Sequence, residues 1–319
     1  MRLVTFEPAP GCERLGLWIG EKVVDLALAG ELCFKRVNIG SPILPTDMMA
    51  FLDQGKSGIQ TAGEVAKYVE DLLAKKGEVV ELSGNVVSND LNKVRLRAPV
   101  PKPPKILCLA LNYKAHASDV NVVVPDNPYV FFKPGFRPVV GTNDKVFRPP
   151  ASQGFTFEGE LAVVIGQRCR SVSREKAYDV VAGYTAVNDM SARDLGKTNV
   201  NQFDWFRVKA FDTSLPMGPC LTLKDEIEDP HDLQLRVRVN GKMAQEASTG
   251  EMVFKIPELI EFISDYVTLD PGDIIATGTP GGSKGALVAG DQVEVEISKI
   301  GILKSVIADR EGQAITKDI

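Results

Sequence analysis

The chain has 319 residues, which is enough for two domains or for one large one. Its hydrophobic content of 44% and its charged content of 25% are ordinary for a globular protein. The formal net charge of −5 excludes the basic footprint that a nucleic-acid-binding protein carries.

The cysteines and the first residues indicate the compartment. Five scattered cysteines without a CxxC pair predict neither a zinc cluster nor a disulfide framework. The opening MRLVTFEPAP lacks the apolar stretch of a signal peptide, and no apolar run approaches the roughly 20 residues that span a bilayer. We therefore expect a cytoplasmic protein that binds neither a membrane nor nucleic acid.

The first hundred residues predict a small mixed domain. LGLWIGEKVVDL is typical of two short strands, and TDMMAFLDQG is typical of a short helix. IQTAGEVAKYVEDLLAKKG has apolar residues at helical spacing and predicts a helix that stops at Gly77. The four prolines of RAPVPKPPK mark a boundary. We predict a small α+β domain over residues 1–100 and a second domain over residues 101–319.

The remaining two thirds are rich in predicted strands with helices between them. KILCLAL predicts a buried strand, and SREKAYDVVAGY predicts an amphipathic helix capped by Ser173. LQLRVRVNGKMAQE alternates and predicts a hairpin that turns at Asn240–Gly241. IPELIEFISDYV predicts a helix, and DQVEVEISKIGILKSVI predicts a terminal pair of strands. Neither GxGxxG nor GxxxxGK[ST] occurs, so no nucleotide-binding fingerprint is present.

Two acids interrupt the apolar run FTFEGELAVVIG. If this run is a strand, Glu158 and Glu160 point to the same face, with Gly159 between them. Two partly desolvated carboxylates so close together resist ionisation, and a divalent cation would remove that conflict. Carboxylate oxygens suit Mg²⁺, Mn²⁺ or Ca²⁺. The alternative is a solvated strand face at a wet edge.

A third acid and a histidine extend this hypothesis. Asp189 follows an apolar segment in TAVNDMSARD and could be a third ligand, or a turn or helix cap. His116 in LNYKAHASDV shares a helical face with Asp119, as a water-activating base and its acidic partner would, or the two form an incidental surface pair. The other histidine, His231, follows a proline and is interpreted as structural.

An ordered series of motifs resembles the fumarylacetoacetate hydrolase family. The series covers about residues 103–306: KILCLALNYKAH, VFFKP, FEGELAVVIG, GYTAVNDMSARD, KAFDTSLPMGP, RVNG with EMVFKIPELIEFIS, and LDPGDIIATGTPGG. The resemblance implies a β-rich α+β fold in which mixed sheets of the C-terminal domain roll into a barrel-like core. It also implies a homodimer and a bound Mg²⁺ or Mn²⁺, with Ca²⁺ as a further candidate.

The family's site residues transfer to this chain position by position. The resemblance implies metal ligands at Glu158, Glu160 and Asp189. It implies catalytic residues at His116, Asp119 and Lys209. It implies substrate-binding residues at Asn112, Tyr113, Thr213 and Thr279. Two positions depart from the family: Asp119 replaces the usual glutamate, and Gly196 replaces a common glutamine.

These residues predict a divalent-metal-dependent hydrolase that cleaves a carbon–carbon bond in a small 2-oxo acid, such as an acylpyruvate or a fumarylacetoacetate-like compound. The same enolate-stabilising site would serve an oxaloacetate decarboxylase or tautomerase, or a sugar-acid dehydratase or isomerase. A further alternative, from another class of protein, is a non-catalytic ligand-binding relative.

Overall fold

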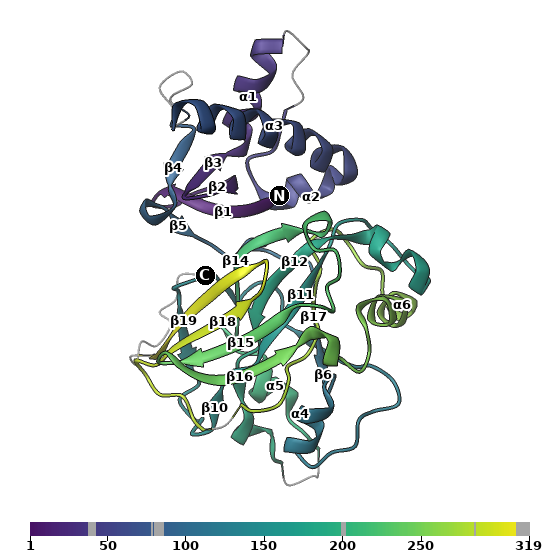
Figure 1. Cartoon of the computed structure of the whole chain (residues 1–319). Coiled ribbons are helices and arrows are strands. Elements are labelled where there is room, and N and C mark those ends of the chain that lie inside the picture. The colour runs from purple at the N-terminus through teal and green to yellow at the C-terminus, as the bar shows by residue number, and fades with distance from the viewer. Residues whose placement is uncertain (38–42, 78, 80–85, 199–201, 284, 311–319) are drawn as a thin grey trace, which may run out of the picture.

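The computed structural model describes residues 1–37, 43–77, 79, 86–198, 202–283 and 285–310 (Figure 1). The N-terminal part lies at one end of the molecule, where the helices lie against a small group of strands. Its strands are β1 (Arg2–Ala9), β2 (Cys12–Ile19), β3 (Lys22–Asp25), β4 (Ser88–Asp90) and β5 (Arg95–Leu96). Its helices are α1 (Leu26–Val37), α2 (Met48–Asp53) and α3 (Gly55–Lys76).

Local sequence signals explain these elements. The two short strands and both helices predicted here are confirmed. Asp47 caps α2, because its side chain accepts a hydrogen bond from the backbone nitrogen of Ala50. Gly77 ends α3 in the left-handed conformation, at φ 73°.

The larger part contains the remaining strands and three short helices. The helices are α4 (Lys114–Asp119), α5 (Trp205–Lys209) and α6 (Ile256–Tyr266). The strands up to residue 192 are β6 (Ile106–Ala110), β7 (Tyr129–Lys133), β8 (Val139–Val140), β9 (Lys145–Arg148), β10 (Phe155–Thr156), β11 (Gly159–Ile165), β12 (Val181–Asn188) and β13 (Ser191–Ala192). The later strands are β14 (Leu215–Leu223), β15 (Gln234–Val239), β16 (Lys242–Ser248), β17 (Ile274–Ala276), β18 (Gln292–Ile297) and β19 (Gly301–Asp309).

One large sheet runs through both parts of the molecule. Within the described residues its strands follow the order β4-β3-β2-β1-β14-β12-β11-β17-β6-β7. The two parts join where β1 pairs antiparallel with β14, with Arg2 opposite Thr222 and Leu3 opposite Leu221. The N-terminal residues are thus continuous with the larger sheet, and the division at residue 100 stays a prediction.

A second sheet packs on the first. Its order is β16-β15-β18-β19-β9, and side chains of both sheets share one buried apolar core. The predicted hairpin is confirmed: β15 and β16 turn at Asn240 and Gly241, which both have positive φ. The predicted helix α6 and the terminal strand pair are confirmed too.

One predicted element is wrong. The segment from Ser173 to Tyr184 is not an amphipathic helix, because a 3₁₀ helix over Arg174–Val180 leads directly into β12. All residues of β12 are buried, and the strand lies between β11 and β14 in the large sheet. Burial on both faces overrides the local helical spacing.

The predicted β-rich α+β fold is confirmed. The described path of the large sheet has two ends, β4 and β7, so the sheet is open and rolled instead of forming a closed barrel. Figure 1 shows α4, α5 and β10 together at the lower end of the larger part, and the candidate site is built from these elements and their neighbours.

Candidate active site

Three buried carboxylates meet at this end of the large sheet. The side-chain oxygens of Glu158, Glu160 and Asp189 lie within 4.8 Å of one another, and the residues are 7%, 1% and 1% exposed. Glu158 lies in the break between β10 and β11, Glu160 lies in β11, and Asp189 directly follows β12. This burial excludes the solvated strand face that was the alternative for the first two acids.

Backbone contacts hold the break in place. The backbone nitrogen of Glu158 donates to the side-chain oxygen of Asn188 at 2.9 Å, and that of Asp189 donates to the carbonyl of Glu158 at 2.8 Å. Gly159 is required between the two glutamates, because a Cβ there would lie 2.5 Å from a methyl carbon of Val237 in the second sheet. The packing of the two sheets therefore fixes where the acids lie.

Three cations surround the acids. Lys209 Nζ lies 2.6 Å from Glu158 Oε2 and 2.7 Å from Asp189 Oδ2. Lys133 Nζ lies 2.8 Å from the other carboxylate oxygen of Asp189, and Arg193 Nη2 lies 3.1 Å from Glu158 Oε1. Glu160 has no such cation within the described residues; its Oε2 accepts a hydrogen bond from the backbone nitrogen of Gly278 at 2.8 Å.

The electrostatics separate the two glutamates. Burial alone would raise the pKa of Glu158, but the neighbouring cations, Lys209 first, lower it to about 2. Burial and then the charge of Asp189 raise the pKa of Glu160 well above its usual value. A divalent cation beside Glu160 would relieve this conflict. The hard oxygen donors of Glu158, Glu160 and Asp189 therefore fit a divalent ion such as Mg²⁺, Mn²⁺ or Ca²⁺.

The histidine of the predicted base lies at the site, but its predicted partner points elsewhere. His116 on α4 lines the same cavity as Glu158, and burial lowers the pKa of its imidazole. Asp119, one turn along α4, uses its carboxylate to accept a hydrogen bond from the backbone nitrogen of Gly282 at 2.6 Å. Among the described residues, no hydrogen bond joins the Asp119 carboxylate to His116.

The four predicted substrate-binding residues have different surroundings. The Asn112 amide donates to the carbonyls of Phe254 and Thr277, so it braces the fold. Tyr113 is 1% exposed, and its hydroxyl has no hydrogen-bond partner in the described part of the chain. Thr279 lines the cavity with His116.

Thr213 does not reach the cavity lining. It has a positive φ of 65°, and its hydroxyl accepts a hydrogen bond from the backbone nitrogen of Phe147 at 2.8 Å. This contact makes it a support for β9.

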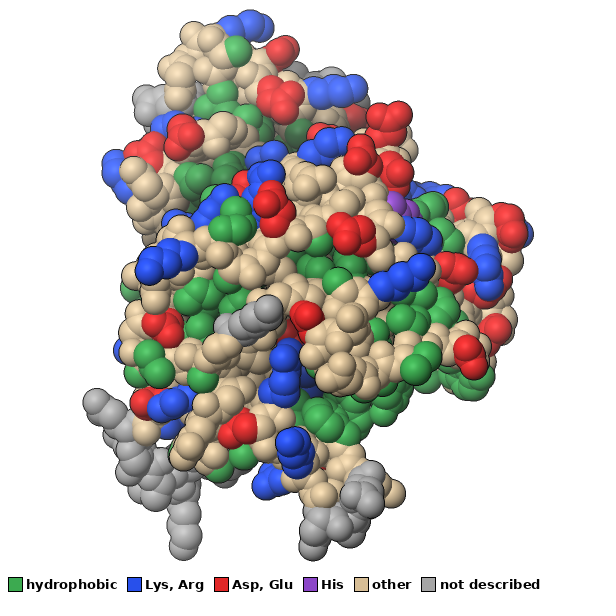
Figure 2. Space-filling view, turned by 60° about the horizontal axis from the view of Figure 1, so that its bottom comes forward, with side chains coloured by type: hydrophobic (Ala, Val, Ile, Leu, Met, Phe, Trp, Pro, Cys, Tyr) green, Lys and Arg blue, Asp and Glu red, His purple; other side chains and the backbone are tan. Residues whose placement is uncertain are grey.

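The cavity has a volume of about 490 Å³ and two chemically different ends. Its charged end contains Glu158, Lys209, Arg193 and His116, and the rest of its lining is largely apolar and aromatic. Figure 2 shows lysine and arginine side chains near the lower centre of this face of the molecule, with hydrophobic side chains beside them. Lys133 and Arg193 were not predicted as site residues, although they lie in the VFFKP and SARD motifs.

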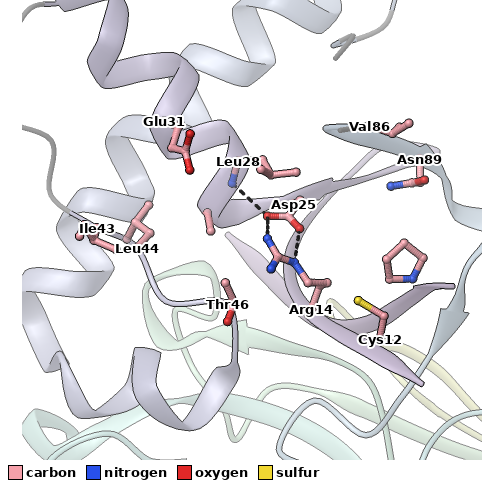
Figure 3. Close-up of a pocket in the computed structure, with 12 residues that line it drawn as sticks. Cys12, Arg14, Asp25, Leu28, Glu31, Ile43, Leu44, Thr46, Val86 and Asn89 are labelled. Carbon is pink, nitrogen blue, oxygen red and sulfur yellow. Dashed lines mark hydrogen bonds and ion pairs between the residues drawn. The ribbon is translucent and has the colours of Figure 1, made fainter. Parts of the chain in front are cut away.

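A larger cavity, of about 690 Å³, lies in the N-terminal part (Figure 3). Its charged centre is a pair whose side chains point toward each other: Arg14 Nε and Nη2 donate to Asp25 at 2.6 Å and 3.1 Å. Asp25 also accepts a hydrogen bond from the backbone nitrogen of Leu28, at the start of α1. These groups satisfy one another, so we do not take this cavity as the active site.

Comparison with known proteins decides the family. The family model described as fumarylacetoacetate (FAA) hydrolase C-terminal matches residues 105–308, which include all three carboxylates and His116. The chain belongs to the fumarylacetoacetate hydrolase family. An oxaloacetate tautomerase of Xenopus laevis, named as mitochondrial, is 37% identical to it over 96% of this chain and 90% of the relative.

Two solved structures of related enzymes cover almost the whole chain. Maleylpyruvate hydrolase from Sphingobium sp. SYK-6, in complex with manganese(II) and pyruvate, is 32% identical, has a TM-score of 0.72, and covers 98% of this chain and 100% of its own. A 2-hydroxyhepta-2,4-diene-1,7-dioate isomerase from Mycobacterium marinum is 30% identical, with a TM-score of 0.70 and the same coverage. Family membership, the fold and an enzymatic role are therefore supported, and the reaction class is left open between hydrolase, isomerase and tautomerase.

The family relationship also bears on metal and location. The buried carboxylates, together with the manganese in the Sphingobium enzyme, support a divalent metal site in this chain. In the described part of the chain, no helix is long and apolar enough to cross a membrane. The cytoplasmic location and the homodimer stay predictions.

Proposed function

We propose that this member of the fumarylacetoacetate hydrolase family is a divalent-metal-dependent enzyme that enolises a small 2-oxo acid, and that its reaction is the tautomerisation of oxaloacetate or a related acid. The observation that carries the proposal is the position of one half-buried imidazole, His116, in the same cavity as Glu158, whose side-chain oxygen lies within 4.8 Å of those of Glu160 and Asp189. Tautomerisation requires only that one group moves a proton between the carbon next to the ketone and the ketone oxygen. The likeness to an oxaloacetate tautomerase over most of the chain supports the same reaction.

The charges of the site suit an anionic oxo acid. When all three carboxylates are ionised, as ligands of a metal ion would be, the charges of Lys133, Lys209 and Arg193 balance theirs. A bound divalent ion would supply Lewis-acid stabilisation of the enolate oxygen and would make the local charge positive. An oxo acid with one or two carboxylates would then restore the balance.

His116 is suited to move the proton. Burial lowers the pKa of its imidazole, so at neutral pH the ring is uncharged and can accept a proton from the carbon next to the ketone. Lys209 holds its charge, because Asp189 and Glu158 keep its pKa above the usual value although burial acts against this. The ammonium can therefore orient the acid without exchanging protons with it.

A second candidate is hydrolysis of a carbon–carbon bond in an acylpyruvate. The specific support is the Sphingobium maleylpyruvate hydrolase, whose structure holds manganese(II) and pyruvate. Hydrolysis needs an oriented base that activates water, and Asp119 is engaged with Gly282 here. Catalytic hydrogen bonds often tighten on substrate binding, so the absence of one between Asp119 and His116, both in the described part of the chain, does not exclude hydrolysis.

The test compares both reactions in one preparation. Enol oxaloacetate is followed by the loss of its ultraviolet absorbance, and acetylpyruvate cleavage by the release of pyruvate, each with Mg²⁺, with Mn²⁺ and with EDTA. We expect metal-dependent tautomerisation, which His116→Ala lowers by roughly 100-fold or more. His231→Ala is the matched control and should keep the rate. An unchanged rate in His116→Ala, or equal rates with EDTA and with metal, would contradict the proposal.

A further inference from the structure

One wall of the active-site cavity is aromatic. Trp205 lies at its centre and stacks on Phe131, with ring centroids 4.6 Å apart. Phe203 and Tyr129 meet the same indole edge-on, at 4.8 Å and 5.5 Å. The indole nitrogen donates to the Tyr129 hydroxyl at 3.1 Å. We call these four residues the aromatic wall. Because its indole donor is already used, the wall offers the cavity mainly carbon surface.

The aromatic wall begins at the charged end of the cavity. Lys209 Nζ, which contacts Glu158 and Asp189, lies 5.7 Å from the centroid of the Phe131 ring. Phe131, Trp205 and Phe203 then follow one another in ring contact. A molecule whose oxo-acid end lies at Lys209 therefore has a continuous aromatic surface along which its other end can lie.

Phe203 occupies space that a polar side chain would need. A Cβ on Gly196 would lie 2.3 Å from one carbon of the Phe203 ring and 2.6 Å from another. Glycine at position 196 leaves room for this ring, which a side chain at that position would displace. Phe203 is 46% exposed although it is apolar, and it lines the cavity. An exposed ring at the wall of a cavity gains most when a ligand covers it.

We propose that the enzyme prefers 2-oxo acids whose far end is apolar, an aryl or branched alkyl group, and that the aromatic wall binds this group. The proposal rests on the proposed function, since it assumes that the oxo-acid end lies at the carboxylate cluster. The cavity, at about 490 Å³, is larger than oxaloacetate needs and is in the range of larger organic ligands. Lys197 also lines the cavity, but its side chain is exposed, and a solvated ammonium adds little to the binding of a second carboxylate.

The test uses three ligands that share one head. Calorimetric titration with Mg²⁺ measures the affinity of the full chain for pyruvate, for phenylpyruvate and for 2-oxoglutarate, which carries a second carboxylate. We expect phenylpyruvate to bind roughly 10-fold or more tightly than pyruvate, because the wall covers its ring. Phe203→Ala should reduce this ratio by roughly 3- to 10-fold. Phe206→Ala is the matched control: its ring is 72% exposed, lies on the same helix as Trp205 and does not line the cavity.

Each outcome decides between the two proposals. Equal affinities for pyruvate and phenylpyruvate, or tighter binding of 2-oxoglutarate than of phenylpyruvate, would overturn the aromatic-wall inference and leave the proposed function intact. A ratio that falls equally in Phe203→Ala and in Phe206→Ala would also overturn it. If none of the ligands binds with Mg²⁺ and oxaloacetate is not enolised, the proposed function fails first, and the inference fails with it.

Discussion

The N-terminal cavity and the active-site cavity both contain charged side chains, but the charges are arranged differently. In the N-terminal cavity, Arg14 and Asp25 come from the neighbouring strands β2 and β3 and neutralise each other. At the charged end of the active-site cavity, three carboxylates converge from the break before β11, from β11 and from the residue that follows β12, and Glu158 among them lines the cavity. The cations that balance them come from three other segments.

This difference separates a structural role from a functional one. Arg14 and Asp25 gain from each other, and Asp25 also starts α1, so folding alone explains the pair. Glu160 gains nothing comparable, because burial and its acidic neighbours raise its pKa. Removing the Asp25 carboxylate should therefore lower stability, whereas removing the Glu160 carboxylate should lower activity without a loss of stability. The predictions below use this contrast, from the largest expected effect to the smallest.

The largest effect is expected from Glu160→Gln. Losing one of three proposed ligands should lower metal-dependent tautomerisation by more than about 100-fold, because even residues behind the ligands typically cost 10- to 100-fold in metal affinity or activity. The free energy of unfolding in EDTA should be unchanged or slightly higher, because the variant removes a buried carboxyl whose ionisation is opposed by burial and by Asp189. Activity with titrated Mg²⁺ and denaturant unfolding measure the two effects.

Glu246→Gln is the control for this prediction. Its side chain is 51% exposed and pairs with Arg236 on the surface of the second sheet, so both measurements should match the unmodified protein. A Glu160→Gln variant that kept full activity with normal Mg²⁺ dependence would remove Glu160 from the metal site.

The next effect concerns the ammonium that bridges two of the acids. Lys209→Met leaves Glu158 and Asp189 without their closest cation, and breaking a buried ion pair costs about 3–5 kcal/mol. We expect this loss of stability in EDTA and a partial recovery with Mg²⁺, because a divalent ion can supply the missing positive charge. Thermal unfolding of both proteins with and without Mg²⁺ measures this; an equal Mg²⁺-induced shift in the two would show that the ion does not bind among these carboxylates.

Much of the fold could be predicted because local signals are strong. The Asn240–Gly241 turn, the end of α3 at Gly77 and the alternation of the hairpin strands depend on neighbours in the sequence. The helix predicted from Ser173 is wrong because the second half of that segment belongs to β12, which is buried between β11 and β14. These pairings form only in the folded protein. Periodicity over one segment contains no information about the partners on either side.

The candidate site could be predicted only in part, for the same reason. The positions of the three acids followed from the family resemblance, and the structure brings their oxygens together. The contact of Lys133 with Asp189 and that of Asp119 with Gly282 join segments far apart in the chain. The clash between a side chain at position 196 and the Phe203 ring depends on how these two residues pack against each other. Such contacts are set by three-dimensional packing, and no spacing rule in the sequence gives them.

A smaller effect is expected in the N-terminal cavity. Asp25→Ala removes the carboxylate that pairs with Arg14 and accepts the hydrogen bond from Leu28 at the start of α1. The loss of a helix-capping side chain predicts a decrease of about 1–2 kcal/mol in the free energy of unfolding. Activity per folded molecule should not change, because this cavity is separate from the active site. A loss of activity at full stability would give the N-terminal cavity a functional role.

The smallest effect concerns the two histidines, which differ in the same way: His231 has a structural role and His116 a proposed functional one. Burial lowers the pKa of both, but His231 Nε2 accepts a hydrogen bond from the backbone nitrogen of Ile256, at the start of α6, whereas His116 lines the cavity. Since the folded pKa of His231 is below its unfolded value, its contribution to stability is complete above the unfolded pKa near 6.5.

That contribution should be lost as the pH falls through the folded pKa of His231, because a protonated Nε2 cannot accept the hydrogen bond from Ile256. His231→Ala should therefore destabilise the protein by no more than about 1 kcal/mol at pH 7.5, and by less at pH 5. Denaturant unfolding of both proteins across this range measures the difference. A difference that stays constant with pH would show that the hydrogen bond to α6 does not depend on the neutral imidazole, and His231 would then act through packing alone.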